Sequence, residues 1–446
     1  MAVKKALIVS YLWPPMEGVG LIRAMKFAKY LTGFGWQPFV LTVKPRINNK
    51  ATGSVPPGVI VLRTDYRDVL HDAKKMFSHR EDAGVTGSEG SEKRSSGMTK
   101  NRIGSIAREV VAMPDEQIGW YDFAVRDGKA LIERERIDLI FSTSPPETAH
   151  LIARKLKKIC GIPWVADLRD LWSDDHFRDR SFLKKAILKM MEGRVLKDAD
   201  AVVTVSVPWA SRLACSIGSR VDVIENGFDE EDFRGAVPVA NKKFTITYTG
   251  KIHRKHQDIS VFLKTIRDLV KSGDIDRGRV DVRFYALGYD RPDIDWMARI
   301  YGLEGIVRDM GRVSYEESII EQKRSDALLF VQWQGRGREG WYSAKLYDYI
   351  GSRRPIIALA ERGGIIEDII RKTASGSIAD DEKALKESLL RLYREYAASG
   401  TVKYCGNEAE VGKNTRRRRA GQLADIFDSL LPKNRAAAER VNTEVQ

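Results

Sequence analysis

Cysteine is scarce in this chain. Cys160, Cys215 and Cys405 are the only three cysteines among 446 residues, and no CxxC pair occurs. An odd number of widely spaced cysteines argues against a disulfide framework and offers no metal-type spacing. We therefore expect a protein of the reducing cytoplasm.

Long apolar runs are missing too. The first residues, MAVKKALIVSYLWPP, place two lysines before an apolar run, but the run is short and no small-residue cleavage site follows. A bilayer-spanning helix needs about 20 apolar residues. We interpret this run as a buried first strand rather than as a signal peptide, and we expect no membrane-spanning segment.

Charge of one sign is not concentrated in a recognisable nucleic-acid module. The chain carries 75 basic and 61 acidic residues, a net charge of +14, and the basic residues are mostly dispersed. A basic balance is compatible with nucleic acid, an anionic membrane or phosphorylated ligands. We expect no nucleic-acid partner, and we interpret the dense run Arg416 to Arg419 as a solvated helix face.

A complete dinucleotide fingerprint is also lacking. Gly18 and Gly20 stand at the head of a predicted helix, but Arg23 replaces the third glycine of GxGxxG, and eight residues separate the strand from Gly18. This argues against a nicotinamide-dependent oxidoreductase. A glycine loop at a helix N-terminus still favours anionic groups, although the glycines could equally just permit a long turn.

Short β-branched runs alternate with amphipathic segments along most of the chain. This alternation predicts an α/β protein with doubly wound parallel sheets, and 446 residues are too many for one ordinary core. The runs that we interpret as strands are ALIVSY, PFVLTV, VIVLR, DLIFST, IPWVAD, DAVVTV and VDVI in a first series, and FTITYTG, VRFYALG, ALLFVQW and PIIALA in a second.

The two series predict two Rossmann-like domains. We expect an N-terminal domain over residues 1–235, with a mobile insertion of Gly, Ser and charged residues at about 78–102, and a C-terminal domain over 236–410. A helix over 411–432 and a disordered tail over 433–446 complete the prediction.

Polar residues follow several predicted strands, where ligands sit in open α/β sheets. In the first series these are Ser144, His150, Asp167, Arg169 and Asp170. The charged residues could equally form an internal network, and a helical histidine is more often packed or solvated than catalytic.

The stretch YTGKIHRKHQD places cations directly after a strand. Lys251, Arg254 and Lys255 follow Gly250, which suits a diphosphate, and an exposed charged turn is the alternative.

The stretch EGWYSAKLYDYIGSRRPIIALA joins a loop to a helix and a further strand. We predict Ser343 as the N-cap, Lys345 and Asp348 on one helix face, and Gly351 as the helix end. Such a connection can hold an anion and a sugar diol. The alternative is a core cluster of Trp341, Tyr347 and Tyr349.

Here the chain resembles the glycosyltransferases of the GT-B fold, in particular the family-4-like branch. The matching blocks keep the order of that family between about residues 6 and 360: PPMEGVG, STSPPETAH, GIPWVADLRDLW, TVS, VIENGFDEEDF, YTGKI, GRVSYEESI and AKLYDYIGSRRPIIAL. The resemblance implies two facing Rossmann-like domains, with the acceptor in the first, the donor in the second, and the last helix packed back on the first. It also implies a retaining, metal-independent transfer of a hexose from a nucleotide-diphosphate sugar, which is a substrate and not a cofactor.

The resemblance also assigns roles to residues. Gly250 and Lys251 match the diphosphate turn, Gly18 and Gly20 the loop over the donor phosphates, Val313 the contact with the base, and Asp348 the second acid of a paired-glutamate motif that contacts the ribose. The first acid is displaced by one residue, because position 340 is glycine and Glu339 precedes it; the usual lysine-glycine after the diphosphate turn is replaced by Gln257-Asp258.

Together these interpretations define the predicted site. The residues that we expect to be catalytic are His150, Asp170, Lys251 and Glu339; those that we expect to bind the donor are Gly18, Gly20, Gly250, Lys251, Arg254, Lys255, Val313, Gly340, Trp341, Tyr342, Ser343, Lys345 and Asp348. The cations would stabilise the departing diphosphate. If the transfer inverted the sugar instead, His150, Asp170 or Glu147 would have to act as a base.

We expect this transfer to serve cell-surface polysaccharide or glycoconjugate synthesis, with a glycan, lipid-linked or small-molecule acceptor. The segments SFLKKAILKMMEGRVLK and IGSIAREVVAM combine apolar and cationic residues, as contact with the inner face of an anionic membrane requires; packing of both on the first sheet is the alternative. A non-catalytic scaffold and a sugar-nucleotide epimerase or hydrolase of the same fold remain the competing functions.

Overall fold

The computed structural model describes most of the chain. The described residues are 3–16, 18–45, 54–69, 71, 113–174, 180–235, 237, 239–253, 256–286, 294–335, 340 and 343–432. The expected insertion at 78–102, the helix IGSIAREVVAM and the tail after residue 432 fall outside them. So do five predicted site residues: Arg254, Lys255, Glu339, Trp341 and Tyr342.

The contacts divide the chain into two compact units. Unit 1 comprises Met1–Glu225 and Ala420–Gln446, and unit 2 comprises Asn226–Arg419. The first division falls inside the stretch VIENGFD. The second falls inside the last helix, so the chain enters and leaves unit 2 at positions that are far apart in the sequence.

Unit 1 is built on a seven-stranded sheet whose strand pairs are all parallel, in the order β3-β2-β1-β4-β5-β6-β7. Central strands such as ALIV are continuous apolar runs because helices cover both faces of a parallel sheet. The strands are β1 (Lys4–Val9), β2 (Trp36–Val43), β3 (Ile60–Thr64), β4 (Leu139–Ser144), β5 (Trp164–Leu168), β6 (Ala201–Thr204) and β7 (Asp222–Val223).

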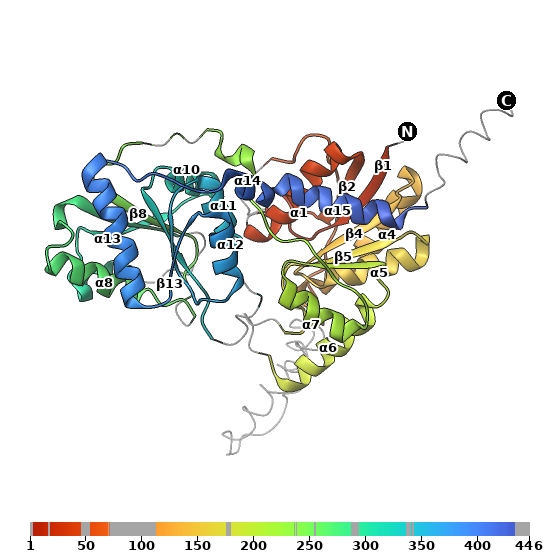
Figure 1. Cartoon of the computed structure of the whole chain (residues 1–446). Coiled ribbons are helices and arrows are strands. Elements are labelled where there is room, and N and C mark those ends of the chain that lie inside the picture. The colour runs from red at the N-terminus through yellow and green to blue at the C-terminus, as the bar shows by residue number, and fades with distance from the viewer. Residues whose placement is uncertain are drawn as a thin grey trace, which may run out of the picture. The chain divides into compact units, whose positions relative to one another are not determined.

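Helices between these strands complete unit 1: α1 (Val19–Leu31), α4 (Tyr121–Glu135), α5 (Thr148–Cys160), α6 (Phe182–Leu196) and α7 (Val207–Ile217). The last helix, α15 (Arg416–Leu430), lies beside α1 in this unit (Figure 1). Its buried Leu423 and Phe427 join the same core cluster as Phe27 and Trp36, and the rings of Trp36 and Phe427 are 5.1 Å apart. The end of the chain thus completes the core of the N-terminal unit.

Unit 2 holds a six-stranded, all-parallel sheet in the order β10-β9-β8-β11-β12-β13 (Figure 1). The strands are β8 (Phe244–Thr249), β9 (Val280–Ala286), β10 (Val307–Arg312), β11 (Ala327–Val331), β12 (Ile356–Leu359) and β13 (Gly376–Ala379). The helices are α8 (Ser260–Lys271), α9 (Ile294–Tyr301), α10 (Tyr315–Lys323), α11 (Lys345–Ser352), α12 (Ile365–Thr373), α13 (Glu382–Ser399) and the short α14 (Glu408–Val411).

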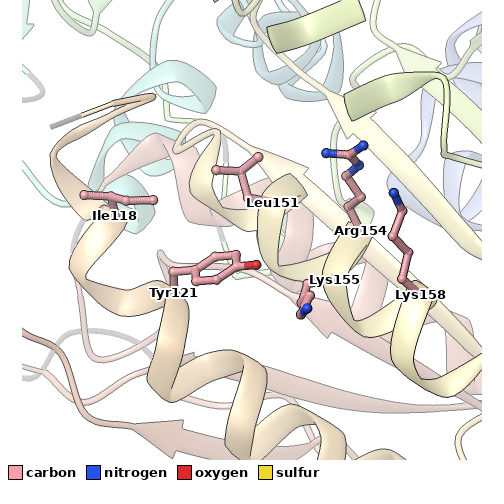
Figure 2. Close-up of a pocket in the computed structure, with 6 residues that line it drawn as sticks. All are labelled: Ile118, Tyr121, Leu151, Arg154, Lys155 and Lys158. Atoms are coloured by element: carbon pink, nitrogen blue, oxygen red, sulfur yellow. The ribbon is translucent and has the colours of Figure 1, made fainter. Parts of the chain in front are cut away.

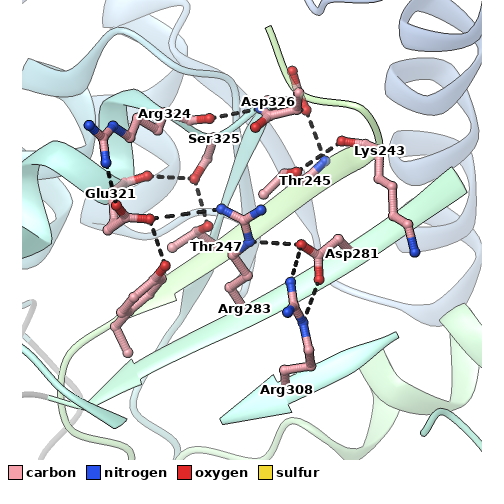
Figure 3. A network of polar contacts seen from close by, with 12 residues as sticks. Lys243, Thr245, Thr247, Asp281, Arg283, Arg308, Glu321, Arg324, Ser325 and Asp326 are labelled. Atoms are coloured by element: carbon pink, nitrogen blue, oxygen red, sulfur yellow. Dashed lines mark hydrogen bonds and ion pairs between the residues drawn. The ribbon is translucent and has the colours of Figure 1, made fainter. Parts of the chain in front are cut away.

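The sequence did not indicate β10 and β13. The second has only four residues, and the first is rich in charge. Figure 3 shows where one of these charges goes: Arg308 of β10 donates twice to Asp281 of β9, at 2.6 and 3.0 Å. Asp281 also accepts from Arg283 at 2.7 Å. A charged strand is stable at this edge because its arginine is paired with a buried carboxylate.

The two segments that link the units are hydrogen-bonded to each other. The Phe228 amide donates to Asn414 O at 3.0 Å, and the Arg416 amide donates to Phe228 O at 2.7 Å. Gly227 permits this approach, since a Cβ there would lie 2.7 Å from Asn414 O. The expected solvated arginine face is therefore wrong for two of its members: Arg416 and Arg419 are buried, and both donate to Asn226.

Each sheet reverses its strand order once, between β1 and β4 in unit 1 and between β8 and β11 in unit 2. Open α/β sheets bind ligands outside the carboxyl ends of the strands at such a point. The loops there contain the predicted motifs: PPMEGVG and PPETAH follow β1 and β4, and TGKIH and the connection to α11 follow β8 and β11.

Candidate functional site

In unit 2 the structure joins two predicted motifs through one tyrosine. Lys345, the first residue of α11, donates from Nζ to the Tyr248 hydroxyl at 2.6 Å, and that hydroxyl donates to Lys251 O at 2.9 Å. Tyr248 belongs to β8, directly before the turn at Gly250, which has φ 114°. The predicted diphosphate turn and the predicted cation of α11 therefore lie side by side.

Lys345 is a partly buried cation whose ammonium group lies over the ring of Tyr248. Burial lowers the pKa of Lys345 to about 7, and the field of nearby Asp348 only partly opposes this. Among the described residues, no ion pair reaches its ammonium group, whose only hydrogen bond goes to Tyr248. An anion bound here would favour the charged form of the lysine and would receive a charge-assisted hydrogen bond.

The tyrosines of α11 have structural roles. Tyr347 and Tyr349 are fully buried, as the core interpretation predicted. The Tyr349 hydroxyl accepts from the Thr249 amide at 2.9 Å, and Gln322 donates to the Thr249 hydroxyl at 3.0 Å. These contacts fix the end of β8 against α10 and α11, so the turn at Gly250 starts from a rigid point.

Asp348 faces α10 rather than Lys345. Its carboxylate accepts from the Tyr315 hydroxyl at 3.1 Å, and the same hydroxyl lies 3.3 Å from Asp232. Burial and these two acids raise the pKa of Tyr315 well above its ordinary value. Tyr315 follows Val313 by two residues, so it brings the predicted base and ribose contacts onto the same side of unit 2.

Three details of the predicted connection are corrected. The helix begins at Lys345 with Ala344 as N-cap, and Ser343 Oγ accepts from the Lys345 amide at 3.3 Å. The helix ends at Ser352, because Arg353 takes the left-handed conformation. Gly351 is needed for packing instead, since a Cβ there would lie 2.7 Å from the rings of Phe228 and Phe233.

The backbone explains one departure from the family pattern. Gly340 stands where a glutamate was expected, and its φ is 79°. Side chains are strained in that left-handed region, whereas glycine adopts it freely. A glutamate at this position would therefore oppose the local turn.

A second departure, Gln257, also has a structural role. Its side chain donates to Val331 O at 2.8 Å and accepts from the His253 amide at 3.1 Å, which ties the loop after β8 to the end of β11. The ring of His256 stacks on that of Trp333, with centroids 4.0 Å apart. The roles of Tyr248 and Tyr315 and this stack could not be predicted from the sequence, because each depends on a contact between distant segments.

In unit 1 the arginine that interrupts the glycine motif is an internal partner. Arg23 contacts Asp167 through Nε and Nη2, the latter at 2.8 Å, and both side chains are buried. Thr143 Oγ1 also donates to Asp167 at 2.8 Å. Asp167 is therefore part of an internal network, as the alternative interpretation proposed.

The two glycines of that motif differ. Gly18 has φ 138° and open space around it, so its backbone conformation requires glycine. A Cβ on Gly20 would lie 2.8 Å from Arg169 Nη2 and from Leu12 Cδ1. Gly20 thus makes room for Arg169, which donates to Pro145 O at 2.6 Å.

His150 is buried between tryptophans rather than exposed in a loop. Its Nδ1 lies 2.7 Å from Ser142 Oγ, and that oxygen accepts from Trp164 Nε1 at 2.7 Å. The serine oxygen can accept from Nδ1 as well, so the tautomer of the ring decides which of the two groups donates. Burial lowers the pKa of His150 to about 4, so the ring is neutral at neutral pH.

Glu147 carries a proton rather than a charge. Burial, followed by the field of neighbouring Asp115, raises the pKa of Glu147 well above the ordinary range. Asp115 is held by the amide and hydroxyl of Thr148, both at 2.7 Å. Asp170 lies on the same side of the sheet, two residues after β5, and its charge opposes the pKa lowering of Arg169 that burial causes.

These residues belong to a polar layer at the carboxyl edge of β4, β5 and β6. Six buried polar atoms of this layer have no hydrogen-bond partner among the described residues: Ser144 Oγ, Glu147 Oε2, His150 Nε2, Arg169 Nη1, Trp172 Nε1 and Ser206 Oγ. Buried polar groups normally have partners. The layer therefore has donors and acceptors available for a hydroxyl-rich ligand.

An open pocket of about 210 Å³ also occurs in unit 1, between the start of α4 and one face of α5 (Figure 2). Its lining consists of Ile118, Tyr121, Leu151, Arg154, Lys155 and Lys158. Arg154 and Lys158 both pair with Asp198, at 2.6 and 2.8 Å. None of the predicted site residues lines this pocket.

The described residues contain neither a metal-binding cluster nor a membrane-spanning helix. No group of three His, Cys, Asp or Glu side chains in this part of the chain is arranged to hold a metal ion. No helix there is both long and apolar enough to cross a bilayer.

Part of the chain is similar to a known domain family. Residues 23–227 match the glycosyl transferase 4-like domain family. No curated protein matches the sequence.

Solved structures match nearly the whole chain. Sucrose-phosphate synthase from Thermosynechococcus elongatus is 15% identical, with a TM-score of 0.61 over 96% of this chain and 99% of that one. A glycosyltransferase from Rickettsia africae is 12% identical, with 0.59 over 96% and 99%. Anabaena HepE, solved with UDP and glucose, is 11% identical, with 0.59 over 96% and 100%.

Identities this low establish the fold alone. The two parallel sheets agree with the expected architecture. The chain therefore shares its fold with these solved structures, and its residues 23–227 are similar to the glycosyl transferase 4-like domain.

Proposed function

We propose that this chain is a glycosyltransferase that transfers a hexose from a nucleotide-diphosphate sugar held at the carboxyl edge of the unit 2 sheet. The observation that carries the proposal is the convergence of Lys345, Tyr248 and the Lys251 turn. A partly buried cation beside a glycine turn is suited to a diphosphate, whose charge increases as the glycosyl bond breaks. HepE of Anabaena, which shares the fold, was solved with UDP-glucose, so UDP-glucose leads the donor candidates.

The remaining donor contacts follow the family pattern. Gly250, Lys251 and Lys345 would hold the diphosphate, Val313 the base and Asp348 the ribose, with Arg254, Lys255, Glu339, Trp341 and Tyr342 completing the site. We propose retention on the family resemblance alone, and transfer without a metal because the cations offer a metal-free way to stabilise the leaving group.

The acceptor belongs to unit 1 in this proposal. The polar layer that contains His150, Glu147 and Arg169 offers a neutral imidazole, a protonated carboxyl group and a guanidinium group. These groups suit the hydroxyls of a glycan or of a lipid-linked sugar better than an apolar substrate. We place the reaction in cell-surface polysaccharide or glycoconjugate synthesis, at the inner face of the membrane.

The test is calorimetric titration of the purified protein with UDP-, GDP-, ADP- and dTDP-sugars without added metal. We expect saturable binding of one donor, and a loss of that binding in Lys251→Ala. Absence of binding across the panel would instead favour a non-catalytic scaffold. Turnover of the donor without any acceptor would favour the epimerase or hydrolase alternative.

A second pair of variants tests the ribose contact. Asp348→Ala should weaken donor binding about tenfold, because a hydrogen bond to a charged group contributes roughly 1.5–3 kcal/mol. Tyr315→Phe keeps the acid and removes only its internal donor, so it serves as the matched control. Equal donor affinity in wild type and Asp348→Ala would remove Asp348 from the site.

A further inference from the structure

Helix α6 has two apolar faces, and unit 1 covers only one of them. The buried face consists of Leu188, Glu192, Val195 and Leu196, with Glu192 accepting from the Ser173 amide at 3.0 Å. This face anchors the helix to the unit. The alternative interpretation, in which the segment packs on the unit, therefore holds for this face, whereas the opposite face is exposed.

The exposed face is apolar at helical spacing. Leu183, Ala186, Ile187 and Met190 are separated by three or four residues, so they form one stripe on the helix. Leu183 is 70% exposed and Met190 48%, and Phe182 at the helix start is 89% exposed. Large apolar side chains that cluster in this way mark an interaction site rather than ordinary surface.

Cations border the stripe. The segment from Ser181 to Lys197 carries Lys184, Lys185, Lys189, Arg194 and Lys197, against Glu192 as its one acid. Burial raises the pKa of Glu192, so its negative charge is weakened as well. Lys185 pairs with Asp174 at 2.5 Å. The exposed face is therefore positively charged as well as apolar.

We propose that the exposed face of α6 docks on an anionic lipid surface, with Phe182 and Leu183 inserted among the acyl chains and the lysines on the headgroups. An apolar stripe bordered by cations is the pattern of helices that lie in the membrane interface. The lysine stems can extend along the apolar boundary while their ammonium groups stay at the headgroups. This inference rests on the proposed function in one respect: a lipid-linked acceptor would lie at this surface.

The test is flotation of the full chain with phosphatidylcholine vesicles that contain about one third phosphatidylglycerol, compared with vesicles of phosphatidylcholine alone. We expect flotation with the anionic vesicles, and a loss of it at high salt because the lysine contribution is screened. The double variant Phe182→Ser/Leu183→Ser should bind at least about tenfold more weakly. Both side chains are solvent-exposed, so we expect the variant to fold.

The matched control is Val207→Ser/Ile300→Ser, which removes two other exposed apolar side chains, 66% and 57% exposed, on α7 and α9. It should float like the wild type. Lys189→Gln should weaken binding to anionic vesicles and leave any residual binding to neutral vesicles unchanged.

Three outcomes would overturn the proposal. The first is that the wild type does not float, and the second is that the Phe182/Leu183 variant floats equally well. The third is self-association of the wild type in analytical ultracentrifugation that this variant abolishes, because a second copy of the chain would then be the occupant.

The calorimetric donor titration is run on the same variants. Donor binding without flotation would contradict this inference alone, whereas flotation without donor binding would contradict the proposed donor site alone.

Discussion

The two sheets end in corresponding loops, yet they place a cation in opposite surroundings. In unit 1, Arg23 lies in the glycine motif and is neutralised by Asp167, which contacts two of its nitrogens. In unit 2, Lys345 is partly buried beside a tyrosine, and no ion pair within the described residues neutralises it. The two motifs are therefore not equivalent: Arg23 completes the packing of unit 1, whereas we propose that Lys345 binds a ligand.

The largest expected effect tests the unit 1 side of this comparison. Arg23→Ala should lower the free energy of unfolding by about 3–5 kcal/mol, because it leaves Asp167 charged and buried. Donor affinity of the protein that remains folded should not change. Urea unfolding and donor titration measure the two quantities separately, and a weakened donor affinity with unchanged stability would reverse the assignment.

The matching variant in unit 2 is Lys345→Met. It should weaken donor binding about 100-fold, since a charge-assisted hydrogen bond contributes roughly 1.5–3 kcal/mol. Unlike Arg23→Ala, it should leave the protein as stable or make it more stable at neutral pH, because burial of the ammonium group is costly. Calorimetry gives the first result and urea unfolding the second. A loss of stability would show that the lysine is structural.

One glycine in each unit allows the packing around the two motifs to be compared. Gly351→Ala should cost about 1–3 kcal/mol, because its Cβ would meet the rigid rings of Phe228 and Phe233. Gly20→Ala should cost less than about 1 kcal/mol, because it meets the ends of the flexible side chains Arg169 and Leu12. Gly412→Ala, which has open space around it, is the control in thermal unfolding.

The last expected effect is a dependence of donor binding on pH. Lys345 is protonated below its pKa of about 7 and neutral above it. A diphosphate binds the protonated form, so affinity should be greatest at low pH and fall about tenfold as the pH rises from about 6 to about 8. Titration in buffers of different ionisation enthalpy should show proton uptake near neutral pH. Lys345→Met should show neither the fall nor the uptake.

The fold could be predicted from the sequence almost completely, and the site only in part. Apolar strand runs and glycine-ended helices carry their own signal, so eleven strands were anticipated, while charged β10 and short β13 were not. The positions of Lys251, Lys345 and Asp348 near strand ends followed from spacing. Their partners Tyr248 and Tyr315 did not, because these contacts join segments separated by up to 97 residues.

Packing around the glycines could not be predicted either. Gly20, Gly340 and Gly351 all look like motif residues in the sequence. The structure gives each a different reason, namely room for Arg169, a left-handed backbone, and contact with two phenylalanine rings. The sequence shows that a side chain is absent but not what occupies the space.

Helix α15 has a consequence for the order in which the chain is made. Its buried residues from Ala420 to Phe427 belong to the core that begins with Ala6 in β1. A ribosome therefore completes all of unit 2 before it supplies the last helix of unit 1. Because domains tend to fold as they emerge, we expect unit 2 to reach its native state first, while the earlier-made unit 1 waits with an unfilled groove for its final helix.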